Sequence, residues 1–152
     1  MTTRLLVVAA LLAAFAAVLL TIRRHAAPAA VLPRVPGVAN PDVTQANIRT
    51  TICRSGWTRT IRPPVEYTNE LKRKQMRAYG LRGAAAAYQE DHLISLEVGG
   101  DPTDPRNLWP EPYPRAAEVD QIENELNAKI CSGALTLEQA QDEESTLKQT
   151  HG

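Results

Sequence analysis

The residues whose types and spacing could support catalysis lie between positions 90 and 110. Asp91 is followed directly by His92, Gly99-Gly100 comes next, and Asn107 lies 15 residues after the histidine. A carboxylate can bind a divalent cation and an imidazole can take a proton from water, and hydrolysis of a phosphodiester needs both actions. Neighbouring residues on a strand point to opposite sides, so Asp91 and His92 can serve one site only where the strand is interrupted.

The pattern around these residues predicts a hairpin followed by a helix. Residues 88–96 have the pattern of a first strand, and residues 107–109 have that of the return strand. The prolines and aspartates between the strands indicate a loop rather than a tight turn. Pro114 suits the first turn of the helix, which we expect to end near Cys131.

Further elements are expected on both sides of this unit, and together they predict an α+β domain. They are a short helix from Asp42 or Thr44 to about Cys53, a strand over 58–62, a helix over 69–79 capped by Thr68, and a last helix over 137–147 with a Thr136–Gln139 capping box.

Charge is distributed unevenly, although 17 basic and 17 acidic residues give a formal net charge of zero. Residues 49–82 hold nine Lys/Arg and two acids, whereas residues 90–148 hold fourteen acids and four bases. A basic half offers a surface for phosphate and an acidic half can hold a divalent cation, although both could also be solvated helix faces. The basic candidates for phosphate contact are Arg54, Arg59, Arg62, Lys72, Arg73, Lys74 and Arg77.

The N-terminal part predicts export. Residues 1–24 contain an apolar run over 5–22, which is long for a signal peptide and about the minimum for a membrane span. A cleaved signal and a retained membrane anchor both remain open. Residues 25–41 are rich in proline and alanine, as in an extended linker, and the domain is expected over 42–148. Either alternative puts the domain outside the cytoplasm, in a periplasmic or extracellular location.

The two cysteines agree with export. An even pair, Cys53 and Cys131, in an exported domain predicts a disulfide. Closing so long a loop would stabilise the domain by about 4 kcal/mol. The alternative, with Cys53 as a nucleophile and His92 as its base, is disfavoured because oxidation outside the cell would silence the thiol.

Residues 88–131 resemble the core of the HNH, or ββα-metal, nucleases, in which an Asp-His pair, a Gly-Gly turn and a central Asn follow one another. The resemblance implies that Asp91 is a metal ligand, that His92 is the general base for the attacking water, and that Asn107 hydrogen-bonds across the loop. It also implies a divalent cation, with Mg²⁺ expected, and DNA or RNA as substrate. The chain from Pro36 to about Leu147 further resembles a group of small exported bacterial proteins, which brings little established function.

The chain departs from the HNH pattern at two positions. Ser95 stands where proline is usual, and the usual second metal ligand falls on Ala116, which cannot bind a metal. At about 100° per residue, Asp120 and Glu123 lie on the same helix edge as Ala116, so they are the replacement ligands that we expect. The favoured function is hydrolysis of nucleic acid with little sequence specificity. The alternatives are a non-catalytic domain that binds nucleic acid or an envelope partner, and a disulfide-stapled structural domain.

Overall fold

A computed structural model of the protein describes residues 37–150, and within this range the fold is α+β. The helices are α2 (Trp57–Ile61), α3 (Val65–Ala78), α4 (Tyr113–Ser132) and α5 (Leu137–Thr150), with short 3₁₀ turns η1 (Ala85–Ala87) and η2 (Leu96–Val98). The expected signal or anchor over 1–24 and most of the linker lie outside the described residues. No helix within 37–150 is long and apolar enough to cross a membrane.

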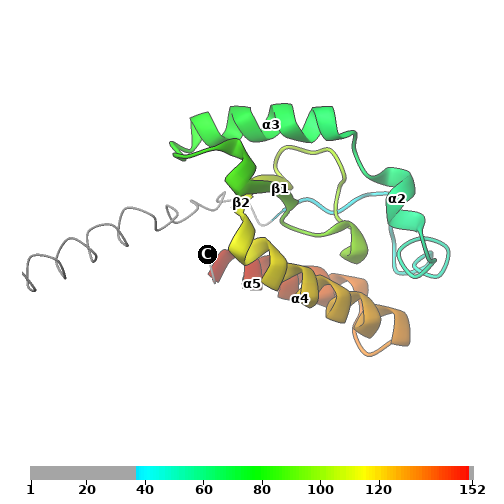
Figure 1. The fold of residues 1–152 in the computed structure, drawn as a ribbon. Coiled ribbons are helices and arrows are strands. Elements are labelled where there is room, and N and C mark those ends of the chain that lie inside the picture. Colours follow the sequence, from blue (N-terminus) through cyan, green and yellow to red (C-terminus); the bar gives the residue numbers. More distant parts are fainter. Residues whose placement is uncertain (1–36, 151–152) are drawn as a thin grey trace, which may run out of the picture.

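The centre of the fold is an antiparallel hairpin of β1 (Tyr88–His92) and β2 (Leu108–Pro112). Asp91 pairs with Trp109 and His92 pairs with Leu108, so the ladder ends at the histidine. The hairpin was expected from the sequence, but its first strand is shorter than 88–96 because the chain turns into η2. Helix α3 packs on one side of this hairpin, and the α4–α5 pair packs on the other (Figure 1).

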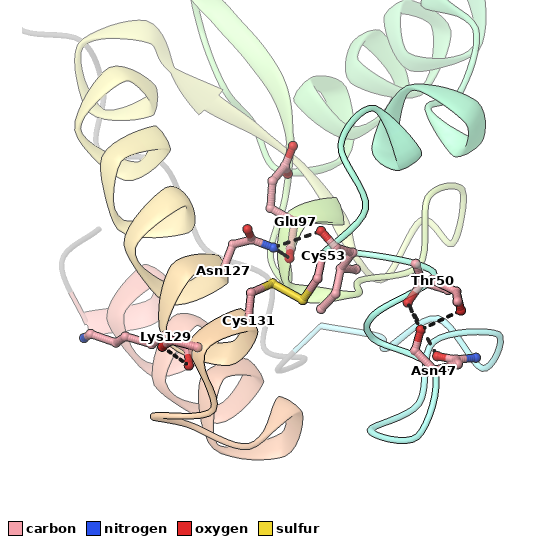
Figure 2. The surroundings of a disulfide bond; sticks show 10 residues. Asn47, Thr50, Cys53, Glu97, Asn127, Lys129 and Cys131 are labelled. Carbon is pink, nitrogen blue, oxygen red and sulfur yellow. Dashed lines mark hydrogen bonds between the residues drawn. A yellow bond between two sulfur atoms is a disulfide. The ribbon is translucent and has the colours of Figure 1, made fainter.

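The segment before α2 differs from the helix expected up to Cys53. It consists of consecutive turns whose backbone hydrogen bonds span three, four and five residues. The side chain of Asn47 bonds to the backbone of Asp42 and Thr44, which offers those groups an alternative to helical partners. The hydroxyl of Thr50 donates in turn to the carbonyl oxygen of Asn47 (Figure 2). The apolar residues expected to point inward are nevertheless buried. These are Val43, Ile48 and Ile52.

Two other sequence predictions need correction. The strand expected over 58–62 is helix α2, because the sheet of the described residues has only the strands β1 and β2 and offers no partner there. Helix α3 begins at Val65, directly after Pro64, and not at residue 69. Thr68 therefore lies inside the helix, where its hydroxyl donates to the carbonyl oxygen of Val65 instead of capping the N-terminus.

Helices α4 and α5 lie close to where the sequence predicts them. Gly133 follows α4 in a left-handed conformation, with φ of 83°. Thr136 and Gln139 form the expected reciprocal capping box at the start of α5: Thr136 N donates to Gln139 Oε1, and Gln139 N donates to Thr136 Oγ1.

The Cys53–Cys131 disulfide is confirmed, and it joins the turn segment to the end of α4 across a sequence separation of 78. Asn127, one turn earlier on α4, donates to the carbonyl oxygens of Ile52 and Glu97, at 3.2 and 2.8 Å (Figure 2). Apolar residues of α4, α5, η2 and the turn segment pack together here as the core. The disulfide and the two hydrogen bonds of Asn127 therefore hold α4 against the turn segment and the loop of the hairpin.

Candidate active site

The interruption of β1 brings Asp91 and His92 to one site. The strand ladder ends at His92, and Leu93 N donates instead to Asn107 O at 2.8 Å, where the connecting loop begins. Both residues are 6% exposed, and both line the same pocket. The break in the strand therefore resolves the opposite orientations that two neighbouring strand residues would otherwise have.

Asn107 holds this loop in shape. Its Oδ1 accepts from the backbone nitrogens of Val38 and Ile94 at 3.1 and 3.0 Å. Its Nδ2 donates to the carbonyl oxygens of Ile94 and Asp101 at 3.0 and 2.8 Å. The side chain is fully buried, so these four bonds satisfy the amide completely. Asn107 thus bonds across the loop, as its place in the sequence suggests.

The second glycine of Gly99-Gly100 is required by this packing. A Cβ on Gly100 would lie 1.8 Å from the carbonyl oxygen of Ile94, which is far inside van der Waals contact. Gly100 N also donates to Ser95 O at 2.8 Å, and Ala39 forms an isolated bridge with Gly100. The chain just before residue 42 is therefore bonded to the loop and is not wholly a free linker.

The hydrogen bond to Pro102 determines which ring nitrogen of His92 can act as a base. Its Nε2 lies 3.2 Å from Pro102 O, and because a carbonyl oxygen only accepts, Nε2 carries the hydrogen. The other nitrogen, Nδ1, is then the one that can take a proton. Burial lowers the pKa of His92, although Asp91 and the Pro102 carbonyl partly offset this effect. The imidazole is therefore neutral at pH 7, which is the form that a general base needs.

A pocket of about 200 Å³ brings together residues that the sequence singled out. Arg62 is at its rim, 57% exposed and 3.7 Å from the carboxylate of Glu97. Asp120 is exposed on α4, whereas Glu123 is 8% exposed. The predicted site residues that line the pocket are Arg62, Asp91, His92, Asp120 and Glu123; Gln89, Ser95, Leu96, Glu97 and Asn124 complete its wall.

The carboxylates of Asp91 and Glu123 converge on an ammonium group that the sequence did not predict as part of the site. Lys148 Nζ, from α5, lies 3.1 Å from Asp91 Oδ2 and 2.7 Å from Glu123 Oε1. It also lies 3.4 Å from Glu144 Oε1 and donates to the carbonyl oxygen of His92. We call Lys148, Asp91, Glu123 and Glu144 the lysine cluster.

Electrostatics keep Lys148 charged within the lysine cluster. Burial alone would lower the pKa of Lys148, but the surrounding carboxylates outweigh burial and raise it. Burial likewise opposes ionisation of Asp91, yet the ammonium keeps the pKa of Asp91 below its usual value. Burial raises the pKa of Glu123 to about 8, although Lys148 opposes this shift. Asp91 and Lys148 therefore form the ionised pair at neutral pH.

Glu111, on β2, is a second residue that the sequence analysis missed. Burial and its interactions with Asp91 raise the pKa of Glu111 to about 9. Arg115 Nη1 lies 3.1 Å from Glu111 Oε1, and the same guanidinium stacks 5.3 Å from the ring centroid of Trp109. The alternation of Glu111 with apolar residues in β2 did not indicate that its carboxyl group is buried beside Asp91, since a glutamate on a hairpin is usually solvated.

The expected pair of metal ligands does not fit a divalent ion in this arrangement. Asp91 and Glu123 do approach one cation, but that cation is Lys148 Nζ. Within residues 37–150 no group of three or more His, Cys, Asp or Glu side chains is arranged to hold a metal ion. Among the carboxylates that line the pocket, Asp120 is the one that forms no ion pair with a described residue.

The basic residues expected to contact phosphate divide into two groups. Lys72 is 9% exposed and its Nζ donates to Tyr88 O at 2.8 Å, so its expected place on the phosphate-binding surface is wrong. Its position on the helix face that packs against β1 explains this burial. The others are exposed, and of these only Arg62 lines the pocket. They are Arg54, Arg59, Arg62, Arg73, Lys74 and Arg77.

Comparison of the chain with models of known protein families, with curated proteins and with solved structures gave no match.

Proposed function

We propose that the domain is an HNH-like phosphodiester hydrolase that acts on nucleic acid outside the cytoplasm, with little sequence specificity. The observation that carries the proposal is the convergence of a neutral, oriented His92, Asp91 and Arg62 on one pocket. The order β1, β2, α4 agrees with a ββα unit. The disulfide is compatible with a location outside the cytoplasm.

In the proposed reaction, Nδ1 of His92 takes a proton from a water molecule in the pocket. The water oxygen forms a bond to phosphorus, and the bond from phosphorus to the leaving sugar oxygen breaks. The leaving oxygen takes a proton from solvent, so the products are a phosphomonoester and an alcohol. Arg62, at the rim of the pocket, is suited to contact a non-bridging phosphate oxygen.

Substrate binding is proposed to depend on charge and not on base sequence. The exposed arginines and lysines of α2 and α3 attract the phosphate backbone as point charges. The pocket itself has several carboxylates, so an anionic substrate also needs a cation there. The divalent ion implied by the family resemblance stays a prediction, and because Asp91 and Glu123 contact Lys148 we derive no catalytic step through it.

The decisive experiment is nicking of supercoiled plasmid by the purified chain, with Mg²⁺, with Mn²⁺ and with chelator. His92→Ala is expected to lower the nicking rate by about 10²-fold or more, because a general base contributes on that scale. His151→Ala, the same substitution at a histidine outside the described residues, is the matched control. Equal rates for His92→Ala and wild type would remove His92 as the base, and activity in chelator would remove the metal requirement.

A second candidate is a non-catalytic domain that binds nucleic acid or an envelope partner. The specific observation in its favour is the lysine cluster, because an ammonium there cannot act as a divalent ion does. Retention of labelled DNA at low salt without nicking under any metal would favour this function. Absence of binding at low salt would instead favour a structural domain.

A further inference from the structure

The site contains a cation of its own, supplied by the side chain of Lys148. The side chain comes from α5, 57 residues after Asp91 in sequence, and Lys148 is only 2% exposed. A lysine four residues after a glutamate, as Lys148 is after Glu144, is ordinarily part of a solvated helix face. Here the same pair is buried against the hairpin and α4.

The ammonium group is fully coordinated. An ammonium has three N–H donors. Lys148 Nζ directs them to Asp91 Oδ2, to Glu123 Oε1 and to the carbonyl oxygen of His92. Glu144 Oε1 is a fourth oxygen neighbour, from the third carboxyl group around the ammonium, and Glu144 Oε2 accepts from Ser95 N at 2.9 Å. One ammonium therefore connects β1, α4 and α5 at the point where β1 ends.

The coordination leaves no place for a divalent ion between the same carboxylates. Mg²⁺ binds oxygen at about 2.0–2.1 Å and Ca²⁺ at about 2.3–2.6 Å. An ion at such distances from both Asp91 and Glu123 would occupy the space that Lys148 Nζ holds at 3.1 and 2.7 Å from them. Two cations in that space would also repel each other strongly. The ammonium and a metal are thus mutually exclusive at this position.

We propose that Lys148 is a tethered cation that takes the position between Asp91 and Glu123 where the sequence predicts a divalent ion. The lysine cluster therefore assembles without metal, and Lys148 is a positioning residue that fixes the carboxylate of Asp91 and the backbone of His92. The proposal concerns the same site as the proposed function, but its test measures the thermal stability of the protein and its binding of Ca²⁺. It can consequently fail or succeed independently of nuclease activity.

The test compares thermal unfolding of the full chain, by circular dichroism, in chelator and with Ca²⁺ alone. The wild type is expected to unfold at the same temperature in both conditions. Lys148→Ala is expected to unfold on the order of 15 °C lower in chelator, because it leaves buried carboxylates without their cation. Ca²⁺ at about 10 mM is expected to return on the order of 5 °C, since three carboxylates without an ammonium form a weak oxygen site.

Lys129→Ala is the matched control. Lys129 lies on α4, is 46% exposed and pairs with Glu143 at 3.7 Å, so its removal should neither lower the unfolding temperature appreciably nor create a response to Ca²⁺. A folded Lys148→Ala variant with wild-type stability and no Ca²⁺ response would overturn the proposal.

A second comparison keeps the proposal testable if Lys148→Ala does not fold. Wild type and Glu123→Gln are titrated with Ca²⁺ and with Mn²⁺. The proposal predicts no saturable stabilisation of the wild type that depends on Glu123. A stabilisation of the wild type that disappears in Glu123→Gln would show that Glu123 holds a metal while Lys148 is present, and would overturn the proposal.

Discussion

Replacement of Asn107 by alanine tests the loop that carries His92. The change removes four hydrogen bonds and leaves backbone groups of Val38, Ile94 and Asp101 without their partners. The two bonds to Ile94 are buried. A buried polar group without a partner costs about 1–3 kcal/mol, and a partly buried one costs less because water can reach it. We therefore expect Asn107→Ala to lower the free energy of unfolding by about 4 kcal/mol.

The measurement is urea unfolding followed by tryptophan fluorescence, with Asn124→Ala as the matched control. Asn124 is exposed on α4, and its Nδ2 makes one bond, to Asp120 O at 2.8 Å. The control is expected to stay within about 0.5 kcal/mol of the wild type. If Asn107→Ala lies within about 1 kcal/mol of the wild type, Asn107 does not hold the loop and our account of how His92 is positioned fails.

Three further predictions concern the disulfide, pH and charge. Replacing both Cys53 and Cys131 by serine should lower the free energy of unfolding by about 4 kcal/mol, measured as a lower urea midpoint that dithiothreitol no longer affects. Burial raises the pKa of Glu90 to about 8, so this carboxyl group loses its proton at a lower pH in the unfolded state than in the folded state, and the free energy of unfolding should fall as pH rises from about 4.5 towards 8. Glu90→Gln should make this fall with pH shallower in urea titrations at successive pH values. An unchanged slope would contradict the raised pKa. Arg62→Ala should lower both DNA binding and the nicking rate. Arg77→Ala, away from the pocket, should lower binding alone and reduce the slope of log binding constant against log salt concentration by about 1. Equal loss of nicking in the two variants would remove Arg62 from the site.

The hairpin, α4 and α5 could be predicted because local signals determine them. Glycine at φ of 83° after α4 and the Thr136–Gln139 capping box are short-range features that a sequence displays directly. The disulfide could be predicted from the number of cysteines and the expected export. By contrast, the turns before α2 depend on Asn47, whose side chain competes for backbone partners. A hydrophobic pattern contains no information on that competition.

The sequence indicated the site residues of the hairpin, but not the ammonium group of Lys148 that balances the charge of Asp91. Asp120 and Glu123 line the pocket together with Asp91, and their expected role as metal ligands stays a prediction. Lys148 could not be predicted, because its spacing from Glu144 is that of an ordinary solvated pair. Its burial follows from how α5 packs on the rest of the domain, and a tertiary contact of that kind has no local signature.

The sequence distance between Asp91 and Lys148 has a consequence for the order in which the domain matures. Polypeptides are synthesised at about 5–20 residues per second, so the ammonium follows Asp91 by roughly 3–11 s. During this interval the carboxylate of Asp91 lacks its counter-charge, and the cost of burying it without a cation opposes closure of the hairpin against α4. A nascent chain therefore acquires the arrangement around His92 only when α5 has docked, which makes the docking of α5 the last step in completing the site.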